Sequence, residues 1–191
     1  GEDSDLRSMI HRVPVTGGEP VLVAGGAEAT WAWSRPRFSR DGRTLFLLAE
    51  HLGESGLDFV GSAKAVAALA VDAEPGTEPR ILTDPVTSDY EAPWSFLEPF
   101  GEESVLAPAR VRGCGELHVI SPEGRVHVLV KGPKVVSAAA ERSGVSVAVV
   151  SEATRPMELA RVAEGRLVRL TDFARPLVAA ATPVEPRELT I

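Results

Sequence analysis

Four glycines that recur at similar spacing are the feature that most limits what this chain can fold into. Each glycine lies between two short stretches in which apolar and polar residues alternate. They are Gly18, Gly76, Gly124 and Gly165, and they lie 58, 48 and 41 residues apart. Alternation with a period of two predicts β-strands, and glycine at the break is typical of a hairpin turn. The sequence therefore predicts four similar hairpins.

A second type of hairpin precedes three of these turns. It is clearest in residues 33–50, where Ser39-Arg40-Asp41-Gly42 separates two strand-like runs, and weaker counterparts occupy 92–110 and 134–153. Two hairpins make four strands, and a four-stranded propeller blade takes about 40–50 residues. The sequence therefore predicts an all-β fold, a partial β-propeller of about three and a half four-stranded antiparallel blades.

The same pattern gives the expected boundaries. Residues 1–23 are expected to form the last hairpin of a preceding blade, 33–84, 91–132 and 133–172 the three blades, and 173–191 an exit segment, a linker or a strand added elsewhere. Residues 50–64, rich in glycine and polar side chains, are expected to form an exposed loop. Residues 62–73 are rich in alanine, which favours helix. Their alternation nevertheless indicates a strand.

Composition excludes several classes of protein. The net charge of −7 argues against a nucleic-acid partner, because phosphate contacts need clustered lysine and arginine. A single cysteine, Cys114, excludes an internal disulfide and a cysteine-cluster zinc site. No apolar run reaches the roughly 20 residues of a membrane helix, and no signal peptide opens the chain. We therefore expect a cytoplasmic protein with no membrane partner, no metal and no cofactor.

Histidines, acidic groups and aromatic residues are the candidates for a functional site. Among the histidines, His51 is expected in the exposed loop, and His118 and His127 are expected to face each other across one hairpin. The acidic groups Asp89-Tyr90-Glu91 and Glu102-Glu103 are expected to be solvated turn residues. Five aromatic residues favour packing between blades, with a peptide-binding mouth as the alternative. They are Trp31, Trp33, Trp94, Phe38 and Phe96.

Two stretches carry a resemblance to a known family. Residues 38–50 (FSRDGRTLFLLAE) resemble a hairpin motif shared by TolB-like and prolyl-oligopeptidase-type propellers. The more specific stretch is 150–191, with Pro156-Met157-Glu158-Leu159, then Leu170-Thr171-Asp172-Phe173, then Glu185 to Leu189. It resembles the last propeller blade of the prolyl oligopeptidase family, in its acylaminoacyl-peptidase-like branch, where the chain continues into an α/β-hydrolase domain.

This resemblance implies a function without catalysis in this chain. A family hydrolase needs a nucleophilic serine in a G-x-S-x-G turn, followed by aspartate and histidine. The nearest string, Gly144 to Ala148, places Ser146 in an alternating strand, and all four histidines precede it. We therefore expect no catalytic, metal or cofactor residues, while the substrate-binding residues stay unknown.

On this interpretation the propeller gates the access of short peptides to the active site of a serine peptidase domain that is absent here. That domain, a peptide substrate and a second copy meeting the open blade edges are the expected partners. The alternative is a stand-alone TolB-like propeller that binds a protein or another ligand. Such a module should return its last strand to complete the first blade, whereas a peptidase propeller should leave through an extended linker.

Overall fold

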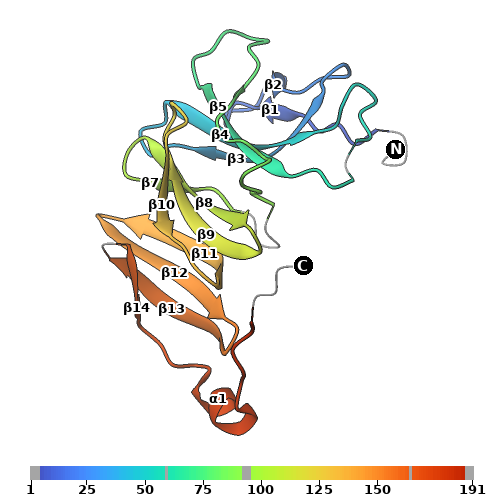
Figure 1. Cartoon of the computed structure of the whole chain (residues 1–191). Coiled ribbons are helices and arrows are strands. Elements are labelled where there is room, and N and C mark those ends of the chain that lie inside the picture. Colours follow the sequence, from blue (N-terminus) through green and yellow to red (C-terminus); the bar gives the residue numbers. More distant parts are fainter. Residues whose placement is uncertain (1–4, 59, 92–95, 164, 188–191) are drawn as a thin grey trace.

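The computed structural model describes residues 5–58, 60–91, 96–163 and 165–187. Three four-stranded antiparallel sheets follow one another along the chain, preceded by a two-stranded sheet (Figure 1). The two-stranded sheet consists of β1 (Ile10–Arg12) and β2 (Val21–Ala24). The prediction of an all-β, partial propeller with four-stranded antiparallel blades is confirmed.

In each four-stranded sheet, strands that are consecutive in sequence pair with one another. Blade 1 contains β3 (Trp31–Phe38), β4 (Thr44–His51), β5 (Lys64–Ala70) and β6 (Arg80–Ile81). Blade 2 contains β7 (Glu98–Phe100), β8 (Ser104–Val111), β9 (Cys114–Ile120) and β10 (Val126–Val130). Blade 3 contains β11 (Lys134–Arg142), β12 (Val145–Glu152), β13 (Arg155–Ala163) and β14 (Arg166–Arg169).

The four repeated glycines occupy equivalent turns. Gly76, Gly124 and Gly165 lie between the third and fourth strands of blades 1, 2 and 3, and Gly18 lies between β1 and β2. All four have a positive φ, which a residue with a side chain adopts only at a cost. The hairpin β1–β2 therefore corresponds to the third and fourth strands of a blade.

The blades are held together by apolar side chains on both faces of each sheet. Along β4, Leu45 and Leu47 pack toward the β1–β2 hairpin, whereas Phe46 and Leu48 pack against blade 2. Because successive side chains of a strand point to opposite faces, burial on both sides requires a continuous apolar run. A similar cluster joins blades 2 and 3. Stacking of neighbouring sheets is therefore what buries the core.

The structure confirms the strand predicted for one segment and shows an unexpected helix in another. The alanine-rich stretch forms β5, as predicted, because its small side chains lie between two neighbouring layers with Ala65 and Ala67 fully buried. In the expected exit segment, the structure has a short helix that was not predicted, α1 (Arg175–Ala181). Pro176 near its start and three alanines at its end favour a helix. The sequence had indicated an exit segment, a linker or an added strand there.

One glycine sets how closely blades 2 and 3 approach. A Cβ atom added to Gly115 in β9 would lie 2.8 Å from the Cα atom of Val135 in β11. We predict that Gly115→Ala lowers the free energy of unfolding by about 1–3 kcal/mol, because the two sheets must move apart. Urea unfolding measures this difference.

Gly113→Ala serves for comparison, since it adds a Cβ in open space but at a positive φ that Gly115 does not have. Gly113 has a φ of +79°, with no other atom within 4 Å of the added Cβ, so it reports backbone strain alone. A Gly115→Ala variant as stable as the wild type would contradict close packing of these two backbones.

Candidate functional site

The histidines do not converge on one place. His127 pairs with Val119 and His118 pairs with Val128, so the two histidines are offset by one residue and point to opposite faces of blade 2. The prediction that they face each other is therefore wrong. The prediction that His51 lies in the exposed loop is also wrong, because His51 is the last residue of β4. Its ring centroid lies 4.8 Å from that of Trp31. Among the described residues, no group of three or more His, Cys, Asp or Glu could hold a metal.

His118 belongs instead to a buried polar chain between blades 1 and 2. Its Nε2 lies 2.8 Å from Oε2 of Glu116, and its Nδ1 lies 2.9 Å from the hydroxyl of Tyr90. A carboxylate only accepts, so in neutral His118 the Nε2 carries the proton and the Tyr90 hydroxyl donates to Nδ1. Burial raises the pKa of Tyr90, which keeps that hydroxyl protonated. These hydrogen bonds anchor Tyr90, and with it the segment that crosses from blade 1 to blade 2.

The acidic residues that flank Tyr90 extend this anchor. Oδ1 of Asp89 accepts hydrogen bonds from the backbone N–H groups of Lys64 and Glu91, and Oδ2 accepts from Arg110. Nζ of Lys64 lies 2.7 Å from Oε1 of Glu91. Burial favours neutral Lys64, but the nearby carboxylates outweigh it and raise the pKa of the ammonium. The expectation of a solvated turn acid is therefore wrong for Asp89, which the crossing segment places against β5 and β8, whereas the side chain of Glu91 keeps 46% of its surface exposed.

Glu141 joins all three blades through the turns that follow their first strands. In blade 3 its Oε1 accepts the N–H of Gly144 at 2.7 Å. Its Oε2 accepts Nη1 of Arg40 in blade 1 at 2.9 Å and the N–H of Gly101 in blade 2 at 3.1 Å. Burial alone would raise the pKa of Glu141, yet these bonds lower it below its ordinary value of 4.5. One carboxylate thus links the turns that follow the first strands of all three blades.

Glu158 has a corresponding role at the end of blade 3. Its carboxylate accepts the hydroxyl of Thr171 and the backbone N–H groups of Phe173 and Ala174, the last two at 3.0 and 2.8 Å. Burial opposes the charge, but these donors lower the pKa of Glu158. Glu158 and Thr171 come from two of the motifs that carried the family resemblance. Their contact fixes the direction in which the chain leaves blade 3.

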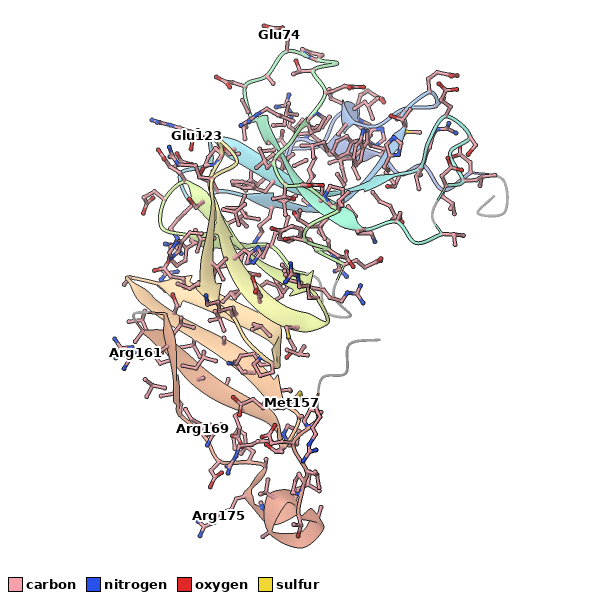
Figure 2. All side chains as sticks on the ribbon, viewed as in Figure 1. Glu74, Glu123, Met157, Arg161, Arg169 and Arg175 are labelled. Carbon is pink, nitrogen blue, oxygen red and sulfur yellow. The ribbon has the colours of Figure 1, made fainter. Side chains whose placement is uncertain are left out.

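One hollow lies between the β1–β2 hairpin and blade 1. We call it the β1 groove, a cavity of about 340 Å³ with Ile10, Val21, Phe38, Leu45 and Leu69 in its walls. Figure 2 shows Glu74, which borders it, at the tip of the loop between β5 and β6. The groove is therefore apolar in its depth and open to solvent at its rim.

The predicted aromatic residues divide between core and surface. Trp33 is buried against the hairpin and Phe96 packs in the cluster between blades 2 and 3, as the packing interpretation expects. Trp31 and Trp33 border a second hollow of about 440 Å³ beside β2, and Phe38 lies exposed in the β1 groove. Trp94 lies outside the described residues. Ser146 lies in strand β12 (Val145–Glu152), as predicted, and is buried there. Cys114 begins β9.

The arrangement was compared with known proteins. No protein-family model matches the chain, and no curated protein matches it. Solved structures do match. The acylaminoacyl peptidase of Pyrococcus horikoshii aligns with a TM-score of 0.65 and 17% identity over 94% of this chain and 25% of that one. The β-propeller domain of the trilobed protease from Pyrococcus furiosus, described as having an open velcro topology, aligns with a TM-score of 0.59 and 16% identity over 90% of this chain and 45% of that one.

This chain has the fold of a β-propeller domain. Prolyl oligopeptidase B from Galerina marginata also aligns, with a TM-score of 0.58 and 13% identity over 87% of this chain and 25% of that one. This chain thus spans about a quarter of the length of the two peptidases and less than half of the trilobed protease structure. In the described residues, no helix is long and apolar enough to cross a membrane.

The Glu141 contacts generate a prediction about pH. A carboxyl group whose pKa is lower in the folded state stabilises the fold above its unfolded pKa, and this contribution is lost as pH falls through the folded pKa. At pH 7 we expect Glu141→Gln to be less stable than the wild type by about 1 kcal/mol, the scale of a charge-assisted bond partly screened by solvent. Below pH 4 the difference should shrink toward zero. Urea unfolding at pH 7, 4.5 and 3 measures it.

Glu102→Gln serves as the control, because Glu102 is an exposed acid in a neighbouring turn. We expect that variant to match the wild type at each pH. A Glu141→Gln deficit that stayed constant from pH 7 to pH 3 would show that the charge is not what links the blades.

Proposed function

We propose that this chain is the non-catalytic propeller portion of a prolyl-oligopeptidase-family serine peptidase, where it gates the access of short peptides to a hydrolase active site outside this chain. The observation that carries the proposal is the Glu158–Thr171 contact, because it joins two of the motifs of the family resemblance in one structural unit. The shared fold with the propeller of a protease and with two peptidases supports it.

Gating would work by steric selection at the turns that follow the first strands. β7 lies next to both β3 and β11, so the first strands of the three blades are neighbours. Arg40, Gly101 and Gly144 are tied to Glu141, and the N–H of Asp41 donates to the carbonyl of Glu102. Turns linked in this way resist separation. An opening bordered by these turns would admit an extended short peptide and exclude a folded protein.

The alternative is a stand-alone TolB-like propeller that binds a protein or another ligand. After β14, residues 170–187 form α1 and irregular segments in the described part of the chain. The partners that follow from the proposal are an α/β-hydrolase domain and a peptide, in the cytoplasm, with self-association wherever blade edges stay open.

A fluorophosphonate probe that reacts with activated serines tests the catalytic part of the proposal. We expect the 191-residue chain to remain unlabelled and to leave short acylated peptides intact, because the sequence has no G-x-S-x-G turn followed by aspartate and histidine. Labelling of the chain would overturn the proposal. The polypeptide encoded by the whole gene should be labelled on a serine outside this chain.

Gating is tested in that longer polypeptide. It should hydrolyse a four-residue peptide and spare a folded protein that contains the same sequence. Glu141→Gln should raise cleavage of a thirty-residue peptide relative to the four-residue one, and the control Glu102→Gln should not. Equal cleavage of short and long substrates by the wild type would contradict gating and leave the fold assignment intact.

A further inference from the structure

The strand β3 contains a bulge on the side of the stack where the first strands of the blades meet. β3 is the edge strand of blade 1, and it lies next to β7, the first strand of blade 2. Its pairing with β4 shifts between Ser34 and Arg37, so that Arg35 and Pro36 together lie opposite Leu47. A bulge of this kind leaves one residue out of the ladder and gives its side chain a new direction.

Arg35 holds a backbone conformation that costs energy. Its φ is +54°, in a region that residues with a side chain rarely adopt. The residue before a proline normally has an extended backbone, so Pro36 makes this conformation still less favourable. Glycine would adopt it without strain. Strained residues cluster at functional sites, where the surrounding structure holds them in place.

The guanidinium of Arg35 has no partner in the described part of the chain. Arg35 is exposed, and its side chain makes no hydrogen bond or ion pair with the described residues. The two arginines that follow it are both paired, Arg37 with Glu98 and Arg40 with Glu141. No contact among the described residues therefore explains why an arginine, in place of a glycine, occupies the strained position.

The charges around Arg35 favour an anion. The first strands β3, β7 and β11 together carry four basic and two acidic side chains, whereas the whole chain has a net charge of −7. Both acidic side chains, Glu98 and Glu141, already bind arginines. Positive charge is thus concentrated where the first strands meet, and it attracts a negatively charged ligand to this place.

We propose that Arg35 binds a carboxylate group of a short peptide that lies along the first strands. The planar guanidinium can donate two parallel hydrogen bonds to the two oxygens of a carboxylate. The bulge holds this donor at the edge of β3 before the peptide arrives, which lowers the cost of ordering it. The inference rests on the proposed function for the presence of the peptide, and it adds a preference for acidic peptides to selection by size. The carboxylate belongs either to an acidic side chain or to the C-terminus of the peptide.

Glycine variants at two arginines separate binding from backbone strain. Arg35→Gly removes the guanidinium and relieves the strain. Arg112→Gly is the matched control, since Arg112 is also exposed, has a φ of +50° and lies in the turn between the second and third strands of blade 2. We expect the Tm of each variant to equal or exceed that of the wild type, because glycine tolerates a positive φ.

Nuclear magnetic resonance titration of the chain with four-residue peptides measures the affinity. A peptide with a glutamate and a free C-terminus should bind about tenfold more tightly than one with glutamine and an amidated C-terminus, the scale of a charge-assisted pair. Two further peptides, each with only one of these changes, show which carboxylate Arg35 binds. Arg35→Gly should abolish the preference, and Arg112→Gly should retain it.

Equal binding of the acidic and the neutral peptide by the wild type would overturn the proposal. So would loss of the preference in Arg112→Gly as well as in Arg35→Gly. A Tm lowered by Arg35→Gly, in this chain or in the polypeptide encoded by the whole gene, would also overturn it, because Arg35 would then have an intramolecular partner.

The longer polypeptide separates this proposal from the proposed function. Its kcat/KM should show the same preference for the acidic peptide, and Arg35→Gly should remove it. Hydrolysis of short peptides without that preference would refute the role of Arg35 and leave the proposed function intact. A polypeptide that hydrolyses no short peptide would refute the proposed function, and the titration of the chain would still decide whether Arg35 binds a carboxylate.

Discussion

A sheet with two apolar faces needs a neighbour on each side, and this requirement governs the whole structure. β4 carries apolar residues at five consecutive positions from Leu45 to Ala49, all buried. Such a strand cannot lie at a surface without exposing one of its faces. Stacking the sheets one behind another meets the requirement, and blade 2, with a neighbour on each side, meets it fully. In repeat structures of this type, stability comes from the interfaces between neighbours more than from any single unit.

Polar contacts fix how the stacked sheets sit relative to one another. Apolar contacts lack direction, whereas hydrogen bonds and ion pairs require particular distances and angles. Tyr90 and His118 join blade 1 to blade 2, Glu141 ties together turns of all three blades, and Glu158 holds the segment that leaves blade 3. Each of these groups is satisfied by several partners, as a buried polar group must be to avoid a large desolvation cost. A rigid set of turns and a fixed exit direction are what a gating domain joined to a catalytic domain would need.

Sequence reasoning found the features that depend on local pattern. Alternation and turn glycines revealed the blades, and alternation outweighed helix propensity in the strand that contains Ala65 and Ala67. Sequence reasoning failed where the position of a side chain depends on strand register or on partners distant in the sequence. A shift of one residue in the pairing of β9 with β10 separates His118 from His127. The partners of Glu141 in the other two blades lie 101 and 40 residues away in the sequence, so no local signal identifies its role as a link between blades. Glu158 could have been found, since it and its partner Thr171 both stand in motifs that carry the family resemblance.

Hydrogen exchange measured by mass spectrometry across the native chain tests the stacking account most directly. If neighbour interfaces supply the stability, then the amides of β8 and β9 in blade 2, which is covered on both faces, should exchange most slowly. Those of β1, β2 and β14, at the two ends of the stack, should exchange fastest. Equal protection in all the sheets, or slowest exchange in β1 and β2, would contradict the account.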